Sequence, residues 1–211
     1  MNKVVSILLV IVVALGAWWG IHWLRERSAA RATTIEFAAM GSVDSQLLEE
    51  VARKTADIFG ASYRIGDQIP IPQSAYDPSR QQYYALAMVG AVPSASEPGA
   101  PHRLAVTEVD IYAPEVRFYF GYWDMQGKRA VVSLARLRPE AYQGGSPNHD
   151  LLVRRAVAEA VHQLAHTYGI QHCAVPGCVM TPSISLADTD AKDGHFCEQC
   201  QPKVEQIMAG Q

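Results

Sequence analysis

One stretch near the C-terminal end constrains the fold of this chain most strongly. Apolar residues recur there at helical spacing, and they predict a long buried helix that begins near Ser146-Pro147 and ends at Gly169. Within it, His162 and His166 are four residues apart, so both imidazoles project from the same helix face. Gly169 lets the chain turn sharply, and His172 follows three residues later. The pattern therefore predicts a helix end at which three imidazoles meet.

Three imidazoles at this spacing can bind a single zinc ion. A site with three protein ligands keeps the fourth tetrahedral position open, which a catalytic zinc requires. The alternative is a helix with two incidental histidines, and a third histidine placed after a glycine stop argues against coincidence. We therefore predict that His162, His166 and His172 are metal ligands.

All four cysteines lie after residue 172 and form two short pairs. Cys173 and Cys178 make one pair, and Cys197 and Cys200 make the other. Two such pairs joined by a loop can close a tetrahedral site of four thiolates around zinc. Two disulfides are the alternative if the domain faces an oxidising compartment. We interpret the pairs as a zinc site, and His195 as a loop residue because four thiolates already complete the coordination.

The segment from His162 to Cys200 resembles the archaemetzincins. Their signature joins the string His-x-x-x-His-x-x-Gly-x-x-His to a following Cys, a Cys-x-Met and a later Cys-x-x-Cys, and here the Cys-x-Met is Cys178-Val179-Met180. The resemblance covers roughly Ile35 to Cys200. It includes four upstream segments: Arg80-Gln81-Gln82-Tyr83, Thr107-Glu108-Val109-Asp110-Ile111-Tyr112, Phe118-Tyr119-Phe120-Gly121 and Ser133-Leu134-Ala135-Arg136-Leu137.

This resemblance implies a fold, two metal sites and a substrate class. The fold would be a metzincin-like α/β zincin domain, with a mixed sheet, an active-site helix and a C-terminal segment held by zinc. The three histidines would bind a catalytic zinc, and the four cysteines a structural one. Met180 would form the Met-turn, an apolar floor beneath the metal, although its sequence position alone also fits ordinary core filling. The substrate would be a peptide or protein.

The chain departs from the family pattern directly after the first histidine. The family has Glu there as the general base that takes a proton from zinc-bound water, and this chain has Gln163. Glu159 lies one helical turn earlier, and we expect its carboxylate to be hydrogen-bonded or salt-bridged rather than placed at the water. Asp150 is expected to serve only the start of the helix.

Two functions therefore remain open. One is a zinc metallopeptidase whose activity is weak or absent because an amide replaces the general base. The other is a catalytically inactive homologue that binds peptides, with Phe118–Tyr122 as a candidate edge strand for pairing with an extended chain. A nucleic-acid module is disfavoured, because the net charge is −3 and the isoelectric point is about 6.1.

The N-terminus is predicted to cross or enter a membrane. From Val4 to Leu24 the only strongly polar residues are Ser6 and His22, and a helix of this length would rise about 30 Å. An uncleaved single-pass anchor is favoured over a cleaved signal peptide, which would make the domain secreted. The side of the membrane on which the domain lies is not determined. We divide the chain into this anchor or signal segment (1–27), a linker (28–33) and one domain (34–211).

Within the domain, alternating strands and helices predict an α/β sheet. Helices are expected from Asp44 to Gly60 and over Arg80–Met88. The expected strands are Thr34–Phe37, Tyr63–Ile71, Leu104–Tyr112, Val116–Tyr122 and Ala130–Leu134.

Overall fold

The computed structural model describes residues 33–95, 99–142 and 145–210. The predicted membrane segment of residues 1–27 lies outside them, and within the described ranges no helix is long and apolar enough to span a membrane. The strands are β1 (Thr34–Met40), β2 (Ser62–Ile65), β3 (Tyr76–Asp77), β4 (Gln82–Tyr84), β5 (His102–Thr107), β6 (Ile111–Ala113), β7 (Val116–Tyr119), β8 (Gly121–Asp124) and β9 (Arg129–Ser133). The α-helices are α2 (Ser45–Phe59), α3 (Ala85–Ala91), α4 (His149–Thr167), α5 (Leu186–Asp190) and α6 (Gln201–Ala209).

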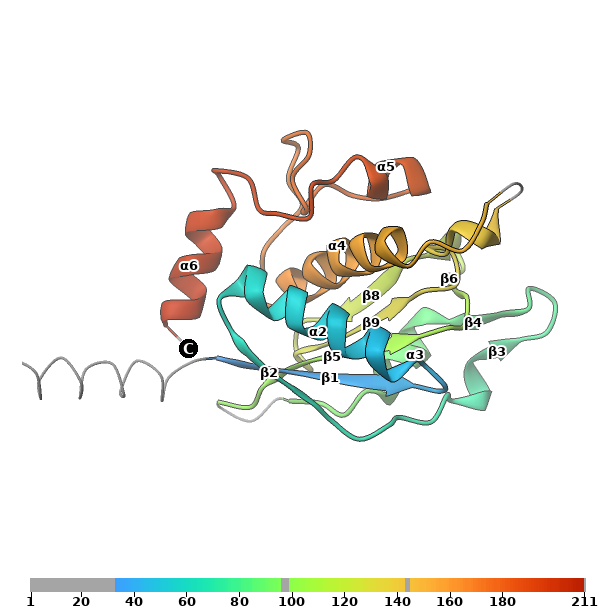
Figure 1. Cartoon of the computed structure of the whole chain (residues 1–211). Helices are drawn as coiled ribbons and strands as arrows, with labels where there is room; N and C mark the ends of the chain where they lie inside the picture. The colour runs from blue at the N-terminus through green and yellow to red at the C-terminus, as the bar shows by residue number, and fades with distance from the viewer. Residues whose placement is uncertain (1–32, 96–98, 143–144, 211) are drawn as a thin grey trace, which may run out of the picture. The chain divides into compact units, whose positions relative to one another are not determined.

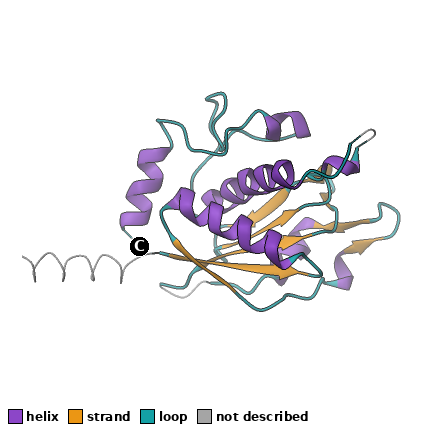
Figure 2. Cartoon of the chain, in the orientation of Figure 1, coloured by secondary structure: helices purple, strands orange, loops and turns teal. Residues whose placement is uncertain are grey.

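The main sheet has five strands in the order β2-β1-β5-β9-β8. All neighbouring pairs are parallel except β8 with β9, which is antiparallel, and β8 lies at the sheet edge. Figure 2 shows the strands of the sheet beneath the helices. The prediction of a mixed α/β sheet is therefore confirmed.

Two apolar layers form because β1 is buried on both faces. Ile35 and Phe37 point to the layer under α2 and α4, whereas Ala38 and Met40 point to the opposite layer with α3. Figure 1 shows α2 and α4 side by side over one face of the sheet. This arrangement fixes α4, the helix that carries the histidines, against the sheet and its edge strand.

The predicted first helix is confirmed as α2. The side chain of Asp44 accepts a hydrogen bond from the backbone N–H of Leu47 at 2.8 Å, and Gly60 ends the helix with a left-handed φ of 62°. The predicted last helix is confirmed as α4, but its start is different. Asn148 caps it by accepting from the N–H of Leu151, so Pro147 lies before the first turn and not inside it.

The helix expected over Arg80–Met88 is wrong in its first half. Gln81 has a φ of 55°, and the following residues form strand β4 before α3 begins at Ala85. Tertiary contacts outweigh local propensity here, because the amide of Gln82 donates to Asp110 Oδ2 and to the carbonyl of Arg117, each at 2.9 Å.

Two of the five expected strands are found as β1 and β9 with slightly different ends, and the other three are divided or shortened. Leu104–Tyr112 is two strands, β5 and β6, which belong to different sheets, because the chain leaves the main sheet after Thr107. Val116–Tyr122 is likewise divided between β7 and β8, so the proposed edge strand Phe118–Tyr122 is interrupted at Phe120. Tyr63–Ile71 keeps only its start as strand β2 and then runs as a loop with one isolated bridge from Ile69 to Met40.

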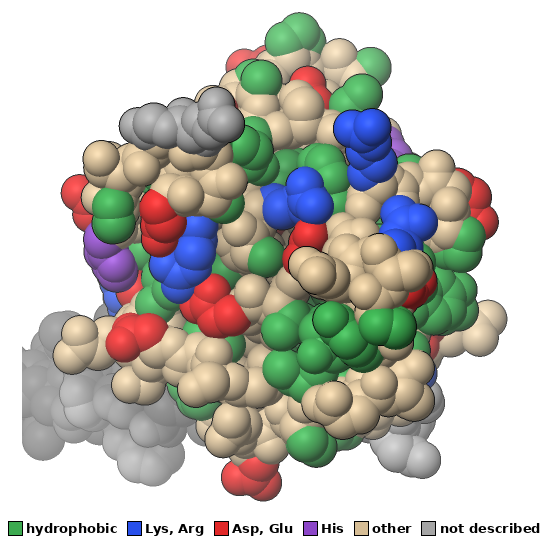
Figure 3. Space-filling model, turned by 90° about the vertical axis from the view of Figure 1, so that its right-hand side faces the viewer, with side chains coloured by type: hydrophobic (Ala, Val, Ile, Leu, Met, Phe, Trp, Pro, Cys, Tyr) green, Lys and Arg blue, Asp and Glu red, His purple; other side chains and the backbone are tan. Residues whose placement is uncertain are grey.

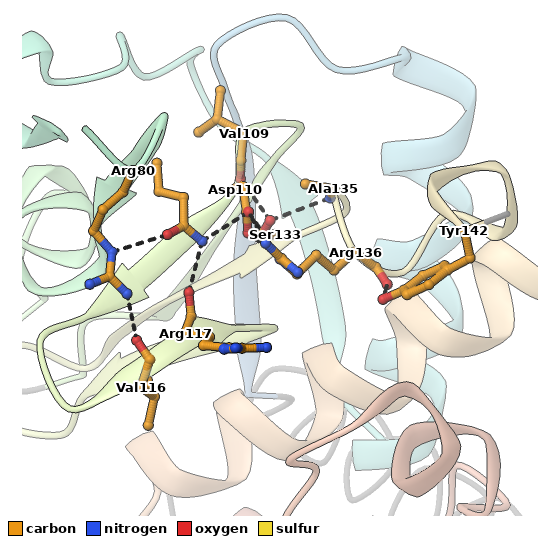
Figure 4. A network of polar contacts seen from close by, with 10 residues as sticks. Arg80, Val109, Asp110, Val116, Arg117, Ser133, Ala135, Arg136 and Tyr142 are labelled. Carbon is orange, nitrogen blue, oxygen red and sulfur yellow. Dashed lines mark hydrogen bonds and ion pairs between the residues drawn. The ribbon is translucent and has the colours of Figure 1, made fainter. Parts of the chain in front are cut away.

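A second sheet, in the order β3-β4-β6-β7, is held together by Asp110. Arg136 binds both oxygens of this carboxylate through Nε at 2.9 Å, and its Nη2 lies 2.7 Å from Oδ2 (Figure 4). Gln82 reaches the same carboxylate, and Arg80 donates to the carbonyl of Val116 at 2.9 Å. Three of the four upstream segments quoted for the family resemblance thus meet in one network that supports β7.

The molecular surface in Figure 3 carries Lys and Arg side chains interspersed with Asp and Glu around a hydrophobic patch. No basic stripe crosses this face.

Candidate metal centre

The end of α4 turns back on itself and so positions the third histidine. Gly169 adopts a φ of 86°, and its N–H donates to the carbonyl of His166 at 2.9 Å. The N–H of Ile170 then donates to the carbonyl of Ala165 at 3.0 Å, which closes the turn. The predicted turn at Gly169 is confirmed, and it carries His172 back toward the helix.

The structure brings the three predicted histidines together. One nitrogen from each of His162, His166 and His172 lies within 4.8 Å of the corresponding nitrogens of the other two. His162 and His166 are buried, and His172 is exposed. The Nε2 atoms of His162 and His166 are 3.1 Å apart, close to the separation of about 3.3 Å that tetrahedral zinc with bonds of about 2.0 Å imposes.

The hydrogen bonds of the two buried imidazole rings favour metal binding over a hydrogen bond between the rings. Nδ1 of His162 lies 2.8 Å from the carbonyl of Val179, and Nδ1 of His166 lies 2.8 Å from the carbonyl of Ile170. Each Nδ1 must therefore donate, so each neutral ring turns an unprotonated Nε2 toward the other. Burial lowers the pKa of both histidines to about 3, which keeps the rings neutral. The lone pairs of the two Nε2 atoms, 3.1 Å apart, repel each other, and a cation bound between them would remove this repulsion.

Trp123 of β8 completes the wall around these rings. Its indole stacks on His166 with ring centroids 3.9 Å apart and an interplanar angle of 16°, and it meets His172 edge-on at 6.3 Å. The sequence analysis missed this residue, because an aromatic side chain in a strand carries no signal that distinguishes a site from a core.

Gln163 is buried against a glycine that leaves room for it. It is 4% exposed, and among the described residues its enclosed Oε1 has no hydrogen-bond partner. A Cβ at Gly121 would lie 2.5 Å from Gln163 Cγ, so only glycine fits at that point of β8. Gly121 appeared among the quoted family segments without a role, and its role is this close approach.

A cavity of about 540 Å³ opens beside the histidines. Its walls come from β8, α4 and the segment 182–184, and they include His162, His172, Gln163 and Trp123. The predicted site residues His162, Gln163 and His172 therefore line the same solvent-accessible cavity.

Glu159 also borders this cavity, and its carboxylate is engaged as expected. Its Oε1 accepts from Ser183 Oγ at 2.8 Å, from Thr189 Oγ1 at 3.1 Å and from Lys192 Nζ at 3.2 Å. The side chains of Glu159 and Lys192 are only 2% and 1% exposed. The expectation of a salt-bridged carboxylate is confirmed, whereas Lys192 was missed because nothing in the sequence marks a lysine as buried. Asp150 is exposed in the first turn of α4.

The four cysteines form a second group that could hold a metal ion. Their sulfurs lie within 4.8 Å of one another, and all four are free thiols rather than disulfides. Sγ of Cys173 and Sγ of Cys197 are 3.8 Å apart, the separation of about 3.8 Å that tetrahedral zinc with bonds of about 2.3 Å sets. His195 is exposed and belongs to neither group, as expected for a loop residue.

The two groups are joined through the segment that contains Met180. The N–H of Cys173 donates to the carbonyl of Met180 at 3.0 Å, and the N–H of Val179 donates to the carbonyl of His195 at 2.9 Å. Val179 also supplies the carbonyl that orients His162. Met180 itself is fully buried in the main core.

Comparison with known proteins places this geometry in a family. The model of peptidase family M54 matches residues 100–206. The archaemetzincin of Methanocaldococcus jannaschii is 40% identical over 166 residues, which cover 79% of this chain and 89% of that protein. The archaemetzincin of Thermococcus kodakarensis is 36% identical and covers 78% of this chain and 91% of its own length.

Solved structures show the same fold. The archaemetzincin of Archaeoglobus fulgidus, crystallised in complex with malonate, superimposes with a TM-score of 0.70 at 32% identity and covers 81% of this chain and 99% of its own. The archaemetzincin of Methanopyrus kandleri gives a TM-score of 0.73 at 28% identity and covers 85% and 97%. The chain therefore belongs to peptidase family M54, the archaemetzincins, a family of zinc metallopeptidases.

Proposed function

We propose that this chain holds a zinc ion on His162, His166 and His172 and acts on peptide bonds as a metallopeptidase of low activity. The observation that carries the proposal is the 3.1 Å approach of two unprotonated Nε2 atoms beside an open cavity. Bound there, zinc would polarise a peptide carbonyl and lower the pKa of a coordinated water to about 7.

The residues around the site provide orientation and a place for the substrate. The carbonyls of Val179 and Ile170 fix the tautomers of the two buried histidines. Strand β8 lies at the sheet edge and borders the cavity, so an extended peptide can pair with its free backbone groups.

The low activity follows from Gln163. An amide does not take up a proton at neutral pH, although it can hydrogen-bond to a ligand in the cavity. General acid–base assistance is worth about 10²–10⁴-fold in rate, so the chain is expected to fall short of a family member with Glu by that factor.

Cleavage of a peptide library by the wild type and by Gln163→Glu tests the proposal. The two side chains have the same shape, and we expect the variant to gain about 10²–10⁴-fold in kcat/KM at unchanged zinc content. Brisk cleavage by the wild type, with no gain in the variant, would contradict this account of the base.

A catalytically inactive peptide-binding protein is the second candidate. The observation that favours it is the amide of Gln163, enclosed where the family places its base. Peptide binding without cleavage by either the wild type or Gln163→Glu would establish this alternative.

We further propose a structural zinc on Cys173, Cys178, Cys197 and Cys200, which makes two zinc ions per chain. The match between the observed 3.8 Å sulfur separation and tetrahedral zinc supports it. The sequence supports a membrane location through residues 1–27 as a single-pass anchor. Fractionation of cells that express the full chain tests this: carbonate-resistant membrane association supports the anchor, and a shortened soluble protein shows a cleaved signal.

A further inference from the structure

One carboxylate oxygen of Glu159 accepts no hydrogen bond from the described residues. All three of its hydrogen bonds, from Ser183, Thr189 and Lys192, go to Oε1. Among the described residues, Oε2 makes none, yet it is not one of the fully enclosed side-chain atoms that lack a partner. Because Glu159 lines the cavity beside the histidines and Oε2 is neither hydrogen-bonded nor fully enclosed, Oε2 is the oxygen available to a ligand there.

The position of this oxygen on α4 places it next to the reacting centre. Glu159 precedes His162 by three residues and Gln163 by four, so the three side chains lie on adjoining positions of the same helix face. The enclosed Oε1 of Gln163 also lacks a hydrogen-bond partner in the ranges that the structure describes. A ligand in the cavity thus meets the Glu159 carboxylate one turn before Gln163, whose own Oε1 is enclosed.

Lys192 determines whether a charged or an uncharged hydrogen-bond donor of the ligand fits beside Glu159. Its ammonium lies 3.2 Å from the Glu159 carboxylate, and both side chains are almost fully buried. The pair is electrically neutral as a whole, so burying a further cation or anion beside it is costly. The cavity therefore offers a hydrogen-bond acceptor without a net negative charge.

The wall formed by residues 182–184, which adjoins Glu159 through Ser183, is held in place by hydrogen bonds. Asp188 Oδ2 accepts from the N–H groups of Ile184 and Ser185 at 3.1 and 2.8 Å, which fixes the start of α5. Arg155 of α4 then grips Asp190 of α5 through two hydrogen bonds of 2.7 Å. This wall presents Pro182 and Ile184, and Val116 of β7 adds a further apolar surface.

We propose that Glu159, held by Lys192, is a specificity-determining residue that selects substrates with an uncharged hydrogen-bond donor at the end of an apolar stem, such as a glutamine side chain, beside the scissile bond. This inference rests on the proposed metal centre but not on hydrolysis. The methylenes of glutamine match the apolar walls, and its amide N–H groups match the unused oxygen of Glu159.

Peptide hydroxamates test this without requiring cleavage, because their hydroxamate group binds zinc directly. A series with Gln, Met, Lys or Glu as the side chain next to the hydroxamate is titrated against the zinc-loaded full chain. We expect the Gln probe to bind roughly tenfold more tightly than the similarly long Met probe, the effect of one hydrogen bond to a charged group. The Lys and Glu probes should bind more weakly than Met.

The matched variant is Glu159→Gln combined with Lys192→Met. Ser183 and Thr189 still donate to the remaining amide oxygen, so an NH2 donor replaces the free carboxylate oxygen, and no buried charge is left unpaired. The double variant should retain its zinc and lose the preference for Gln over Met, whereas Asp150→Asn, an exposed acid on the same helix, should keep the wild-type ratio. If the wild type binds the Met probe as tightly as the Gln probe, the inference about Glu159 is wrong, while the proposed metal centre stands. This holds whatever the double variant does. Failure of every hydroxamate to bind would overturn the proposed metal centre and the inference with it.

Discussion

The three-histidine centre and the four-cysteine cluster follow each other directly in the chain, at His172 and Cys173, yet they differ in what surrounds them. The histidine centre borders a cavity of about 540 Å³, and the buried amide oxygen of Gln163 beside it has no hydrogen-bond partner within the described part of the chain. The cysteine cluster has two of its four members buried, and its four sulfurs lie within 4.8 Å of one another. An open coordination position supports chemistry, whereas a complete one supports folding.

The largest expected effect comes from breaking the closed cluster. Cys200→Ser should lose one zinc per chain and disorder the segment after Met180, since structural zinc contributes about 10–16 kcal/mol in small zinc domains. Metal analysis and proteolysis measure this. His195→Ala, an exposed residue in the same loop region, is the control and should keep two zinc ions; retention of both by Cys200→Ser would remove the structural site.

Removing a ligand from the three-histidine centre should destabilise the fold less than removing one from the cysteine cluster. His166→Ala should lose one zinc, keep the cysteine-bound one and leave the protein folded. Metal content and circular dichroism check this, with the exposed His149→Ala on the same helix as control. A variant that loses both metals would show that the two centres are one folding unit.

A smaller effect is expected at the contact between β8 and α4. Gly121→Ala puts a Cβ 2.5 Å from Gln163 Cγ and 2.8 Å from the carbonyl oxygen of Val131, so it should lower the free energy of unfolding by about 1–3 kcal/mol. Gly90→Ala, in α3 with open space around it, should be neutral or stabilising. Equal denaturation midpoints for the two variants would contradict this account of Gly121.

The smallest effect concerns a buried histidine outside both centres. His102 is hydrogen-bonded to Thr167 and stacked on Tyr168, and burial lowers its pKa from 6.5 to about 4. Between these values the unfolded chain binds the proton and the folded chain does not, so stability falls as pH drops. The loss from pH 7 to pH 5.5 should be about 1 kcal/mol. Urea unfolding of His102→Gln should show a correspondingly shallower pH dependence; an unchanged slope would count against it.

The histidine and cysteine groups were predictable because ligand spacing along the chain is itself the signal. His162 and His166 share a helix face, Gly169 marks the turn, and both features depend only on backbone geometry. The helix over Asp44–Gly60 was predictable for the same reason, since its cap and its apolar stripe are local.

What could not be predicted depends on contacts between distant segments. Lys192 becomes buried only because Glu159 lies 33 positions earlier on a packed helix. Gln82 is extended because Asp110 and the backbone of Arg117 hold its amide. Gly121 and Trp123 matter through their distance from α4, which no pattern within their own strand encodes.

The glycine at position 121 has a consequence for how such a protein can change over generations. Glutamine and glutamate have the same outline, and the space that Gly121 leaves beside residue 163 admits either one. A single nucleotide exchange in the codon converts one into the other, and no neighbouring side chain has to move. If the proposed role of residue 163 holds, one inherited substitution separates an active peptidase from an inactive peptide-binding protein, in either direction.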